Sequence, residues 1–274
     1  MLSLRPYKIW LITLCAANRV IIVNARALNM QLNINNRMIS IEFDRCSLKK
    51  NMNYAIKNNI KGYVCTINSN LLCQAYLDNK IANVLENSIY NVCDGTVLAK
   101  TIGKIYRKKY QSYPGPDYFH DIIVNNNLKY CFLGNTSEVL NKLKINIKSM
   151  NNSLEDCIYL SLPYNNVDSF DYIEIAHIIN SHEPDIIFIS LGAPKQELFA
   201  AEINKYLKKG ISICVGAAFD FHAGQIKRAP KRFRNWGLEW LWRIYTNPQK
   251  TLKRLYSEFY IMPRVIYKMY RDHK

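Results

Sequence analysis

Three short motifs of common phosphate-handling proteins are absent from this sequence of 274 residues. It contains no Gly-x-Gly-x-x-Gly and no Gly-x-x-x-x-Gly-Lys-Ser/Thr, which removes most of the support for a dinucleotide oxidoreductase or a P-loop NTPase. It also lacks Asp-x-Asp, the carboxylate pair that holds a divalent metal in many enzymes that use nucleotide sugars. A phosphorylated ligand would therefore need protein cations in place of a metal ion, and we expect no cofactor.

Metal-binding and disulfide patterns are missing as well. None of the eight cysteines has the Cys-x-x-Cys spacing, and the five histidines are scattered, so we expect no metal site. Cys65, Cys131 and Cys214 lie inside apolar runs of the strand type, which is typical of reduced thiols in a core. Free cysteines favour a reducing compartment, and we expect a cytoplasmic protein.

No segment reaches the roughly 18 to 20 continuous apolar residues of a transmembrane helix. The nearest candidate is residues 9–17, which follow Arg5 and Lys8 in the manner of a signal peptide. An extension outside the main fold, or a start site placed too far upstream, would give the same pattern. The free cysteines favour these two interpretations, so we assign residues 1–36 to an N-terminal extension.

Acidic residues are scarce: 21 Asp and Glu stand against 37 Lys and Arg, for a formal net charge of +16. The excess is concentrated in residues 225–274, which contain thirteen Lys and Arg and three acidic residues. Such a surplus indicates a polyanionic partner, such as a nucleic acid, an anionic lipid or a phosphorylated substrate.

Apolar runs that turn polar at their ends alternate with segments of helical composition along residues 37–224. Strands that alternate with helices form a parallel sheet covered on both faces, so we expect an α/β fold with a Rossmann-like, mostly parallel sheet. An Asn-rich linker at residues 29–37 would precede it. The expected strands are 38–43, 63–68, 91–93, 130–134, 157–162, 185–191 and 211–216.

Residues 225–274 are predicted to form a basic, helical C-terminal appendage. Leu252, Leu255, Tyr256 and Phe259 have helical spacing with basic residues between them, which predicts an amphipathic helix that Pro263 breaks or kinks. Three tryptophans precede it. These aromatic residues suit either docking onto the core or contact with a membrane surface, and both interpretations stay open.

Polar residues at the ends of two apolar runs are candidates for catalysis. Asp94 ends one run and is followed by Gly95, which permits a sharp turn that exposes the carboxylate as a general base. On spacing alone, Asp-Gly is more often a simple turn. Thr66 and Asn68 end the preceding run, where they would either line a ligand pocket or cap the next helix.

A second group of candidates follows the run that ends at residue 191. Gly192 begins a Gly-x-Pro turn that frees backbone N–H groups, and Lys195, Gln196 and Glu197 follow it, an arrangement able to hold phosphate or ribose oxygens.

Two more strand-end residues, Asp220 and Gly134, have two interpretations each. Asp220 would bind a ribose or a base edge, or cap the next turn. Gly134 would leave room for a ligand, or serve as an ordinary turn glycine.

Three motifs follow one another in a fixed order: Gly192-Ala193-Pro194-Lys195-Gln196-Glu197, then Phe219-Asp220 with Gly224 and Arg228-Ala229-Pro230, and then Glu239-Trp240-Leu241 with Arg243. In this order they resemble the WecG/TagA/CpsF family of bacterial glycosyltransferases, and the resemblance covers roughly residues 37–260. It implies inverting transfer of a sugar, of the N-acetylmannosamine type, from a UDP-sugar to an N-acetylglucosamine linked by diphosphate to undecaprenyl, in cell-surface polysaccharide synthesis.

The same resemblance implies roles for single residues. Asp94 would be the base, Thr66 and Asn68 would line the acceptor or donor pocket, and Gln196 would lie beside the reacting sugar. The family also implies that the appendage supplies cations for the departing diphosphate and for substrate binding. These are Arg228, Arg243, Lys250 and Lys253, with lysine at two positions where the family commonly has arginine.

One departure from the family pattern concerns the donor. The family's Glu-Arg-x-x-Gly-x-Asp corresponds here to residues 111–117, where Gln111 and Ser112 replace the charged pair while Gly115 and Asp117 remain. A different UDP-hexose or a uronic acid donor is therefore an alternative. A fold of this family without transferase activity is another, although Asp94 and Gln196 are present.

The expected partners follow from these assignments. An amphipathic basic helix would hold the enzyme peripherally on the inner face of the plasma membrane, where the lipid-linked acceptor and anionic headgroups lie. A homo-oligomer is compatible with the sequence. The rival from another class is a basic nucleic-acid-binding protein, but no recognisable binding motif accompanies the charge, so we expect no nucleic-acid partner.

Overall fold

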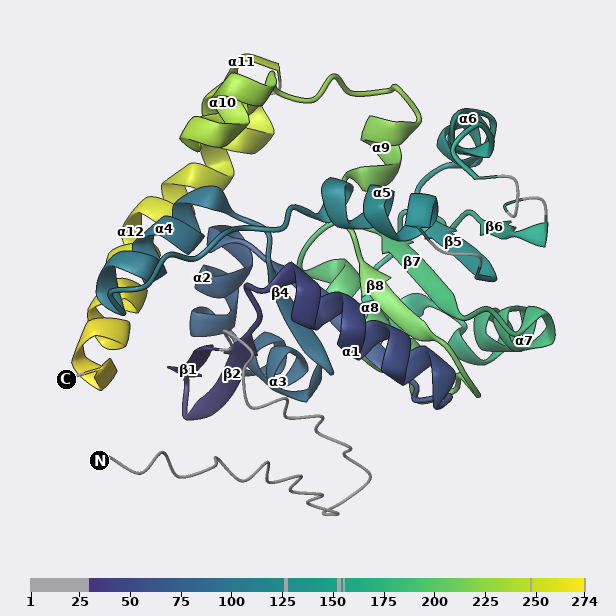
Figure 1. Ribbon diagram of the computed structural model, residues 1–274, viewed down its shortest axis with the longest axis horizontal. Coiled ribbons are helices and arrows are strands. Elements are labelled where there is room, and N and C mark those ends of the chain that lie inside the picture. Colours follow the sequence, from purple (N-terminus) through teal and green to yellow (C-terminus); the bar gives the residue numbers. More distant parts are fainter. Residues whose placement is uncertain (1–29, 126–127, 152–153, 155, 247, 274) are drawn as a thin grey trace, which may run out of the picture.

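A computed structural model describes residues 30–125, 128–151, 154, 156–246 and 248–273 (Figure 1). The signal-like stretch 9–17 lies outside the described residues. The strands and helices of the described chain form an α/β fold with a helical C-terminal segment, as the sequence predicts.

Six parallel strands form the central sheet, in the order β4-β3-β8-β7-β5-β6. Their side chains are almost all buried in the four inner strands, which explains the continuous apolar runs in the sequence. The strands are β3 (Gly62–Ile67), β4 (Tyr90–Cys93), β5 (Tyr130–Gly134), β6 (Ile158–Leu160), β7 (Ile186–Ser190) and β8 (Ile211–Cys214).

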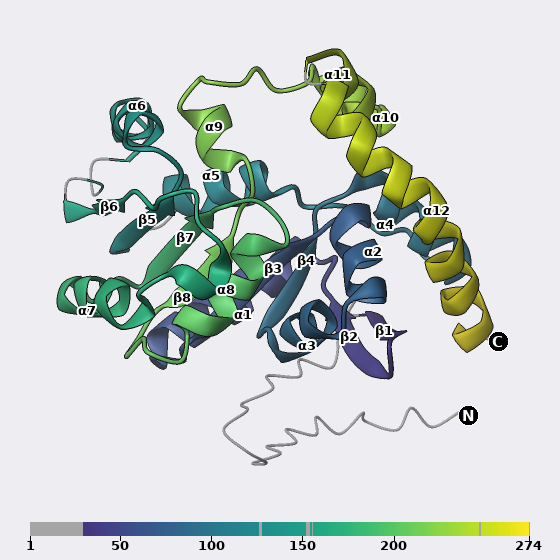
Figure 2. The same cartoon turned by 180° about the vertical axis from the view of Figure 1, so that it is seen from behind.

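Helices cover both faces of the sheet, and each face has its own apolar core (Figures 1 and 2). Alternate strand residues divide between them: Val64 and Ile213 pack on one face, and Cys65 and Cys214 on the other. The first face carries α1 (Arg45–Lys57), α5 (Gly115–Asn125), α6 (Ser137–Lys148) and α9 (Ala218–His222). The second carries α2 (Ser69–Leu77), α3 (Asn79–Asn87), α4 (Thr96–Ile105), α7 (Tyr172–His182) and α8 (Lys195–Ile203).

An antiparallel hairpin of β1 (Met30–Ile34) and β2 (Arg37–Ile41) precedes α1, so the prediction of a linker at residues 29–37 is wrong. The two turn residues, Asn35 and Asn36, have φ of 52° and 61°, which asparagine tolerates better than most residues. The Asn35 side chain also donates to the carbonyls of Ala75 and Tyr76. The asparagines that suggested a linker therefore form the turn of a hairpin.

The appendage consists of α10 (Lys231–Trp236), α11 (Glu239–Thr246) and α12 (Pro248–His273). Helix α12 lies along α2 and α4 and continues through Pro263, so the predicted break is wrong (Figure 2). Its second half buries Val265 and Met269 against the core, whereas its first half exposes Tyr256 and Phe259. The second half of α12 therefore docks onto the core, and its first half has an exposed apolar face.

Candidate active site

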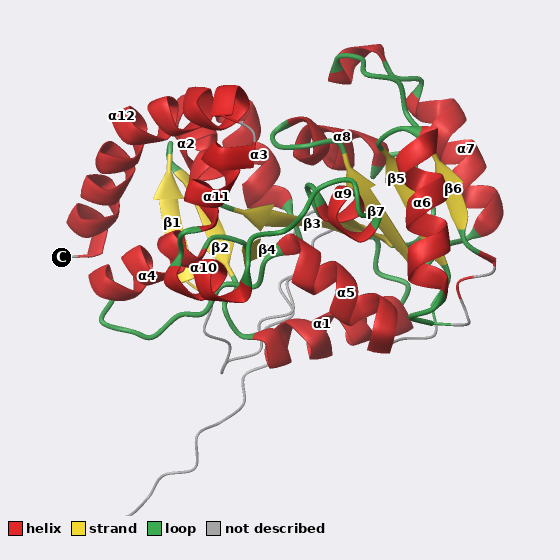
Figure 3. Cartoon of the chain, turned by 90° about the horizontal axis from the view of Figure 1, so that it is seen from above, coloured by secondary structure: helices red, strands yellow, loops and turns green. Residues whose placement is uncertain are grey.

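The carboxyl ends of the parallel strands meet at one edge of the sheet, and the appendage lies beside part of that edge. Seen from above, α10 and α11 lie over the end of the molecule that holds β4 and α4 (Figure 3). Ligands of open α/β sheets bind beyond the carboxyl ends of strands. The sequence-predicted residues of the strand ends and the appendage are therefore brought to one region.

Asp94 follows β4 and is held by the neighbouring turns. Its backbone N–H donates to the carbonyl of Ile67, and its Oδ1 accepts a hydrogen bond of 2.9 Å from the backbone N–H of Gly115. The Nδ2 of Asn68 lies 3.5 Å from Asp94 Oδ2. These contacts join the ends of β3 and β4 to the first turn of α5 and fix the direction of the carboxylate.

The charge environment of Asp94 is mixed. Burial raises the pKa of its carboxyl, and the nearby charge of Glu239 acts in the same direction. The Gly115 hydrogen bond and the positive charge of Arg243 lower that pKa. A carboxylate with a raised pKa is a stronger base than an ordinary aspartate, which suits proton abstraction from a hydroxyl.

Thr66 and Asn68 are occupied by structural hydrogen bonds. The Thr66 hydroxyl is buried and donates to the carbonyl of Cys214 at 2.9 Å, which ties β3 to β8. Asn68 Oδ1 accepts from the backbone N–H of Leu71 and caps α2. The capping interpretation of Asn68 is confirmed, and its amide nitrogen still reaches Asp94.

Gln196 and Glu197 lie in the first turn of α8, and both are buried. The Gln196 Nε2 donates to Glu197 Oε1 at 2.8 Å, while Gln196 Oε1 accepts from the backbone N–H of Gly216 at 3.1 Å. Gln196 is 1% exposed and Glu197 is 0% exposed. The Gln196 side chain therefore connects Glu197 to the turn after β8.

Two strand-end turns face open space. A Cβ added to Gly192 after β7, or to Gly216 after β8, would have no neighbour within 4 Å. Gly134 differs, because a Cβ there would lie 2.7 Å from the carbonyl oxygen of Ser190. Close approach of β7 therefore explains Gly134, whereas the turns after β7 and β8 border open space.

Lys195 and Asp220 lie at the same edge, with partners from the protein. The Lys195 ammonium is 5.0 Å from the ring centres of both Tyr164 and Phe170, and burial lowers its pKa. Asp220 accepts a hydrogen bond of 3.1 Å from the side chain of Asn135, which follows β5. Asp220 thus links the turn after β5 to α9.

Arg228 pairs with Asp117 in α5. Its two terminal nitrogens lie 2.5 and 3.0 Å from the two carboxylate oxygens of Asp117, and Arg234 lies 3.6 Å from Oδ1 of the same carboxylate. Burial alone would raise the pKa of Asp117, but these arginines outweigh it and hold the pKa below its usual range. The pair fixes the segment before α10 to α5.

Beside the predicted Arg243, the appendage brings Arg254 and Glu258, which the sequence analysis did not assign to the site. Arg243 lies 3.0 Å from Glu239, and Arg254 Nε lies 3.1 Å from Glu258 Oε1 on the inner side of α12. Asp94 is within the electrostatic range of both arginines. The sequence contained a signal for the inward position of Arg254, because Arg254 lies on the same helical face as Glu258, Val265 and Met269. The side chains of Lys250 and Lys253 lie outside what the structure describes.

Around Ser112, which replaces the charged residue of the family pattern, another arginine is present. The guanidinium of Arg45 donates to the carbonyl of Ser112 at 3.0 Å and lies 4.2 Å from the centre of the Tyr113 ring. The Ser112 hydroxyl lies 3.1 Å from that of Thr96. A cation thus contacts the backbone of the altered segment from α1.

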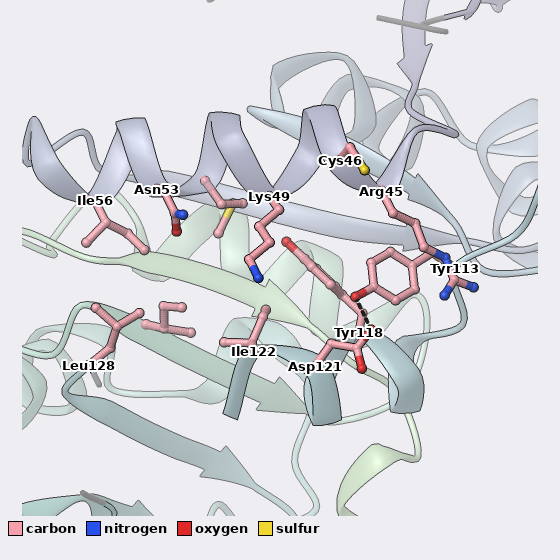
Figure 4. Close-up of a pocket in the computed structure, with 12 residues that line it drawn as sticks. Arg45, Cys46, Lys49, Asn53, Ile56, Tyr113, Tyr118, Asp121, Ile122 and Leu128 are labelled. Atoms are coloured by element: carbon pink, nitrogen blue, oxygen red, sulfur yellow. Dashed lines mark hydrogen bonds between the residues drawn. The ribbon is translucent and has the colours of Figure 1, made fainter. Parts of the chain in front are cut away.

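A separate hollow of about 190 Å³ lies between α1 and α5. Figure 4 shows Lys49 reaching into it from α1, and Tyr113 bonded to Asp121 on the opposite side. Tyr113 belongs to both regions, since its backbone N–H donates to the carbonyl of Cys93, directly before Asp94. The hollow contains none of the predicted site residues.

The described residues contain neither a metal-binding cluster nor a membrane-spanning helix. Within residues 30–273, apart from the gaps, no three His, Cys, Asp or Glu side chains are grouped so that they could hold a metal ion. Among the helices of the described chain, none has the length and apolar character needed to cross a membrane.

Comparison with known proteins agrees with this arrangement. A model described as "Glycosyl transferase WecG/TagA/CpsF family" matches residues 36–274. The N-acetylglucosaminyldiphosphoundecaprenol N-acetyl-beta-D-mannosaminyltransferase of Bacillus subtilis (strain 168) is 27% identical over 208 residues, which are 73% of this chain and 77% of that protein. The protein of the same name from Bacillus spizizenii is 34% identical over 91 residues, which are 33% of this chain and only 35% of that relative. Because the family model covers most of the chain, this protein is a transferase enzyme that belongs to the WecG/TagA/CpsF family of glycosyl transferases.

Proposed function

We propose that this enzyme transfers an N-acetylmannosamine-type sugar from UDP to the N-acetylglucosamine of a polyprenyl-diphosphate-linked acceptor. The names of the two Bacillus relatives support the donor sugar and the acceptor. The observation that carries the proposal is Asp94, whose carboxylate is oriented at the sheet edge by Gly115 and Asn68 with Arg243 nearby.

The proposed reaction is a single displacement. The acceptor hydroxyl attacks the anomeric carbon of the donor on the face opposite to UDP, and its proton passes to the Asp94 carboxylate. The bond between the anomeric carbon and the phosphate oxygen breaks, and its electron pair remains on UDP. This sequence inverts the configuration at the anomeric carbon.

Protein cations support a metal-independent mechanism. UDP leaves with additional negative charge, and cations fixed near that charge stabilise the transition state. Arg243 is held by Glu239, and Arg254 lies near Glu258, so both guanidinium groups are fixed within range of Asp94. We assign charge stabilisation to Arg243 and Arg254, without a divalent ion.

The donor sugar has an alternative that a specific observation favours. Ser112 replaces a charged residue of the family pattern, and Arg45 contacts the backbone at that position. A UDP-hexose or uronic acid donor would meet the guanidinium of Arg45 there, in place of the arginine that the family pattern has at position 112. The donor panel below distinguishes these possibilities from UDP-N-acetylmannosamine.

The lipid-linked acceptor requires contact with a membrane surface. Helix α12 exposes Leu252, Tyr256 and Phe259 on its first half, at 53, 68 and 79%, within a segment rich in Lys and Arg. Exposed aromatic side chains beside basic residues bind the interface of anionic bilayers. We propose that this face holds the enzyme on the inner leaflet of the plasma membrane.

The test is UDP release with a panel of UDP-sugars, a diphosphate-lipid-linked N-acetylglucosamine acceptor and EDTA. Wild-type protein should release UDP only when the acceptor is present, and Asp94→Asn should reduce the rate by about 10²- to 10⁴-fold. Asp156→Asn, an exposed aspartate outside the site, is the matched control. Acceptor-independent release, or full activity of Asp94→Asn, would contradict the proposal.

A further inference from the structure

Glu197 is a buried acid directly below the strand ends. It lies in the first turn of α8, with 0% of its surface exposed. Its Oε1 accepts the hydrogen bond from Gln196, while its Oε2 is buried without a hydrogen-bond partner among the described residues. A buried oxygen without a partner is costly when it carries charge, so this environment disfavours the ionised form.

Glu197 determines the orientation of the Gln196 side chain. Because the Gln196 amide nitrogen donates to Glu197, its oxygen points the other way and accepts from the backbone N–H of Gly216. Ser190 at the end of β7 donates to the Gly216 carbonyl at 2.7 Å. The chain of contacts from Glu197 therefore fixes the turn after β8, which faces open space.

Titratable groups on three neighbouring elements interact electrostatically with Glu197, and one of them, Asp94, is an acid. Asp94, after β4, raises its pKa, and the charge of Glu197 in turn affects the thiols of Cys65 in β3 and Cys214 in β8. No Lys or Arg in the described part of the chain forms an ion pair with it. Burial raises the pKa of Glu197 to about 7, although the Gln196 hydrogen bond opposes the shift.

We propose that Glu197 is a positioning residue: as an uncharged carboxylic acid it holds Gln196 against the Gly216 turn, and loss of its proton places a second negative charge beneath the UDP site. The location of UDP at this edge rests on the proposed function. Gln196 and Glu197 thus do not need to touch the substrate to be essential to its binding.

UDP binding by calorimetry between about pH 6 and 8.5 tests this role, because the pKa of Glu197 is about 7. Wild-type affinity for UDP should weaken about three- to tenfold as the pH rises, because a nearby carboxylate repels the diphosphate. Glu197→Gln keeps the acceptor oxygen and cannot ionise, so its affinity should not show this loss. Glu202→Gln, on the outer side of the same helix, is the matched control and should behave as wild type.

Steady-state kinetics separate positioning from catalysis. Glu197→Ala removes the support of Gln196, and we expect the donor KM to rise at least about fivefold while kcat changes less. Identical pH dependence of UDP affinity in wild type and Glu197→Gln would overturn the role of its charge. An unchanged donor KM in Glu197→Ala would overturn the positioning role.

Infrared spectroscopy of the Asp94→Asn protein provides a measurement that needs neither a folded Glu197 variant nor activity. A carbonyl band of a protonated, buried carboxylic acid should be present at acidic pH and disappear as the pH rises through the pKa of Glu197, which in this variant lies below the wild-type value of about 7 because the Asp94 charge that raises it is gone. Absence of the band at acidic pH would overturn the inference. Failure of UDP to bind at any pH would instead contradict the proposed donor, and the infrared titration would still decide the state of Glu197.

Discussion

The backbone N–H of Gly115 donates a hydrogen bond of 2.9 Å to Oδ1 of Asp94, 21 residues earlier in the chain. Gly115 begins α5, so a helix N-terminus, with its partial positive charge, faces the carboxylate. The same residue lies against the residue that follows β8, because a Cβ on Gly115 would be 2.8 Å from the carbonyl oxygen of Val215. Gly115 can come close enough to donate this hydrogen bond because glycine has no side chain.

Gly115→Ala should displace the first turn of α5 and lower activity more than stability. Overpacking of this size costs about 1 to 3 kcal/mol, while a displacement of about 1 Å at a catalytic group costs on the order of 10²-fold in rate. Thermal unfolding and UDP release measure the two effects. Val124→Ala, at an exposed position near the other end of α5, is the control. Equal losses of activity in the two variants would contradict this explanation.

The acidic limb of the pH–rate profile should report Asp94. A base must be ionised to act, so kcat/KM should fall as the pH decreases through a pKa that burial holds above that of an ordinary aspartate. Arg243→Ala removes a charge that lowers this pKa, and the acidic limb should move to higher pH. Arg243→Lys keeps the charge and should leave the limb near its wild-type position. If the acidic limb lies at the same pH in all three proteins, it does not report the ionisation of Asp94.

The ion pair of Asp117 and Arg228 should contribute to stability. Arg228→Lys keeps the charge but loses the two-pronged hydrogen bond, and we expect a loss of about 1 to 2 kcal/mol in the free energy of unfolding. The folded pKa of Asp117 is lowered, so its stabilisation is present above the unfolded pKa and is lost as the pH falls through the folded value. Chemical denaturation at neutral and acidic pH tests both statements, and Asp117→Asn should abolish this part of the pH dependence.

The exposed face of α12 should bind anionic vesicles. Replacing Tyr256 and Phe259 with serine removes apolar surface that the core does not use, and binding should weaken about fivefold or more. Tyr54→Ser, a half-exposed tyrosine on α1, is the control for loss of an aromatic residue elsewhere. Sedimentation with vesicles at low and high salt measures the effect. Binding that high salt abolishes entirely would indicate electrostatic attraction without insertion of the aromatic rings.

The strands and helices of the core could be predicted because local patterns are enough to specify them. The inner strands are mostly apolar runs, and polar residues follow strand ends, as Asn68 follows β3 and Asp94 follows the edge strand β4. Parallel strands bring those ends to one edge without further information. The hairpin at Asn35 and Asn36 escaped prediction because its asparagines carry a turn signal as well as the composition of a linker.

Side-chain partners were decided by packing between distant elements. Asp117 and Arg228 are 111 residues apart, and only the docking of the segment before α10 against α5 brings them together. Arg254 lies among the basic residues of the predicted amphipathic helix, and the packing of α12 on α2 determines that its side chain faces inward.

The sequence by itself determined the α/β fold, the family motifs and the placement of Asp94 at a strand end, because apolar periodicity and strand polarity act locally. Only the tertiary structure decided that Gln196 and Glu197, adjacent residues of one motif, are both buried and bonded to each other below the Gly216 turn. Burial depends on what the rest of the chain places around a residue. The ionisation of Glu197 therefore follows from its surroundings and not from its place in the motif.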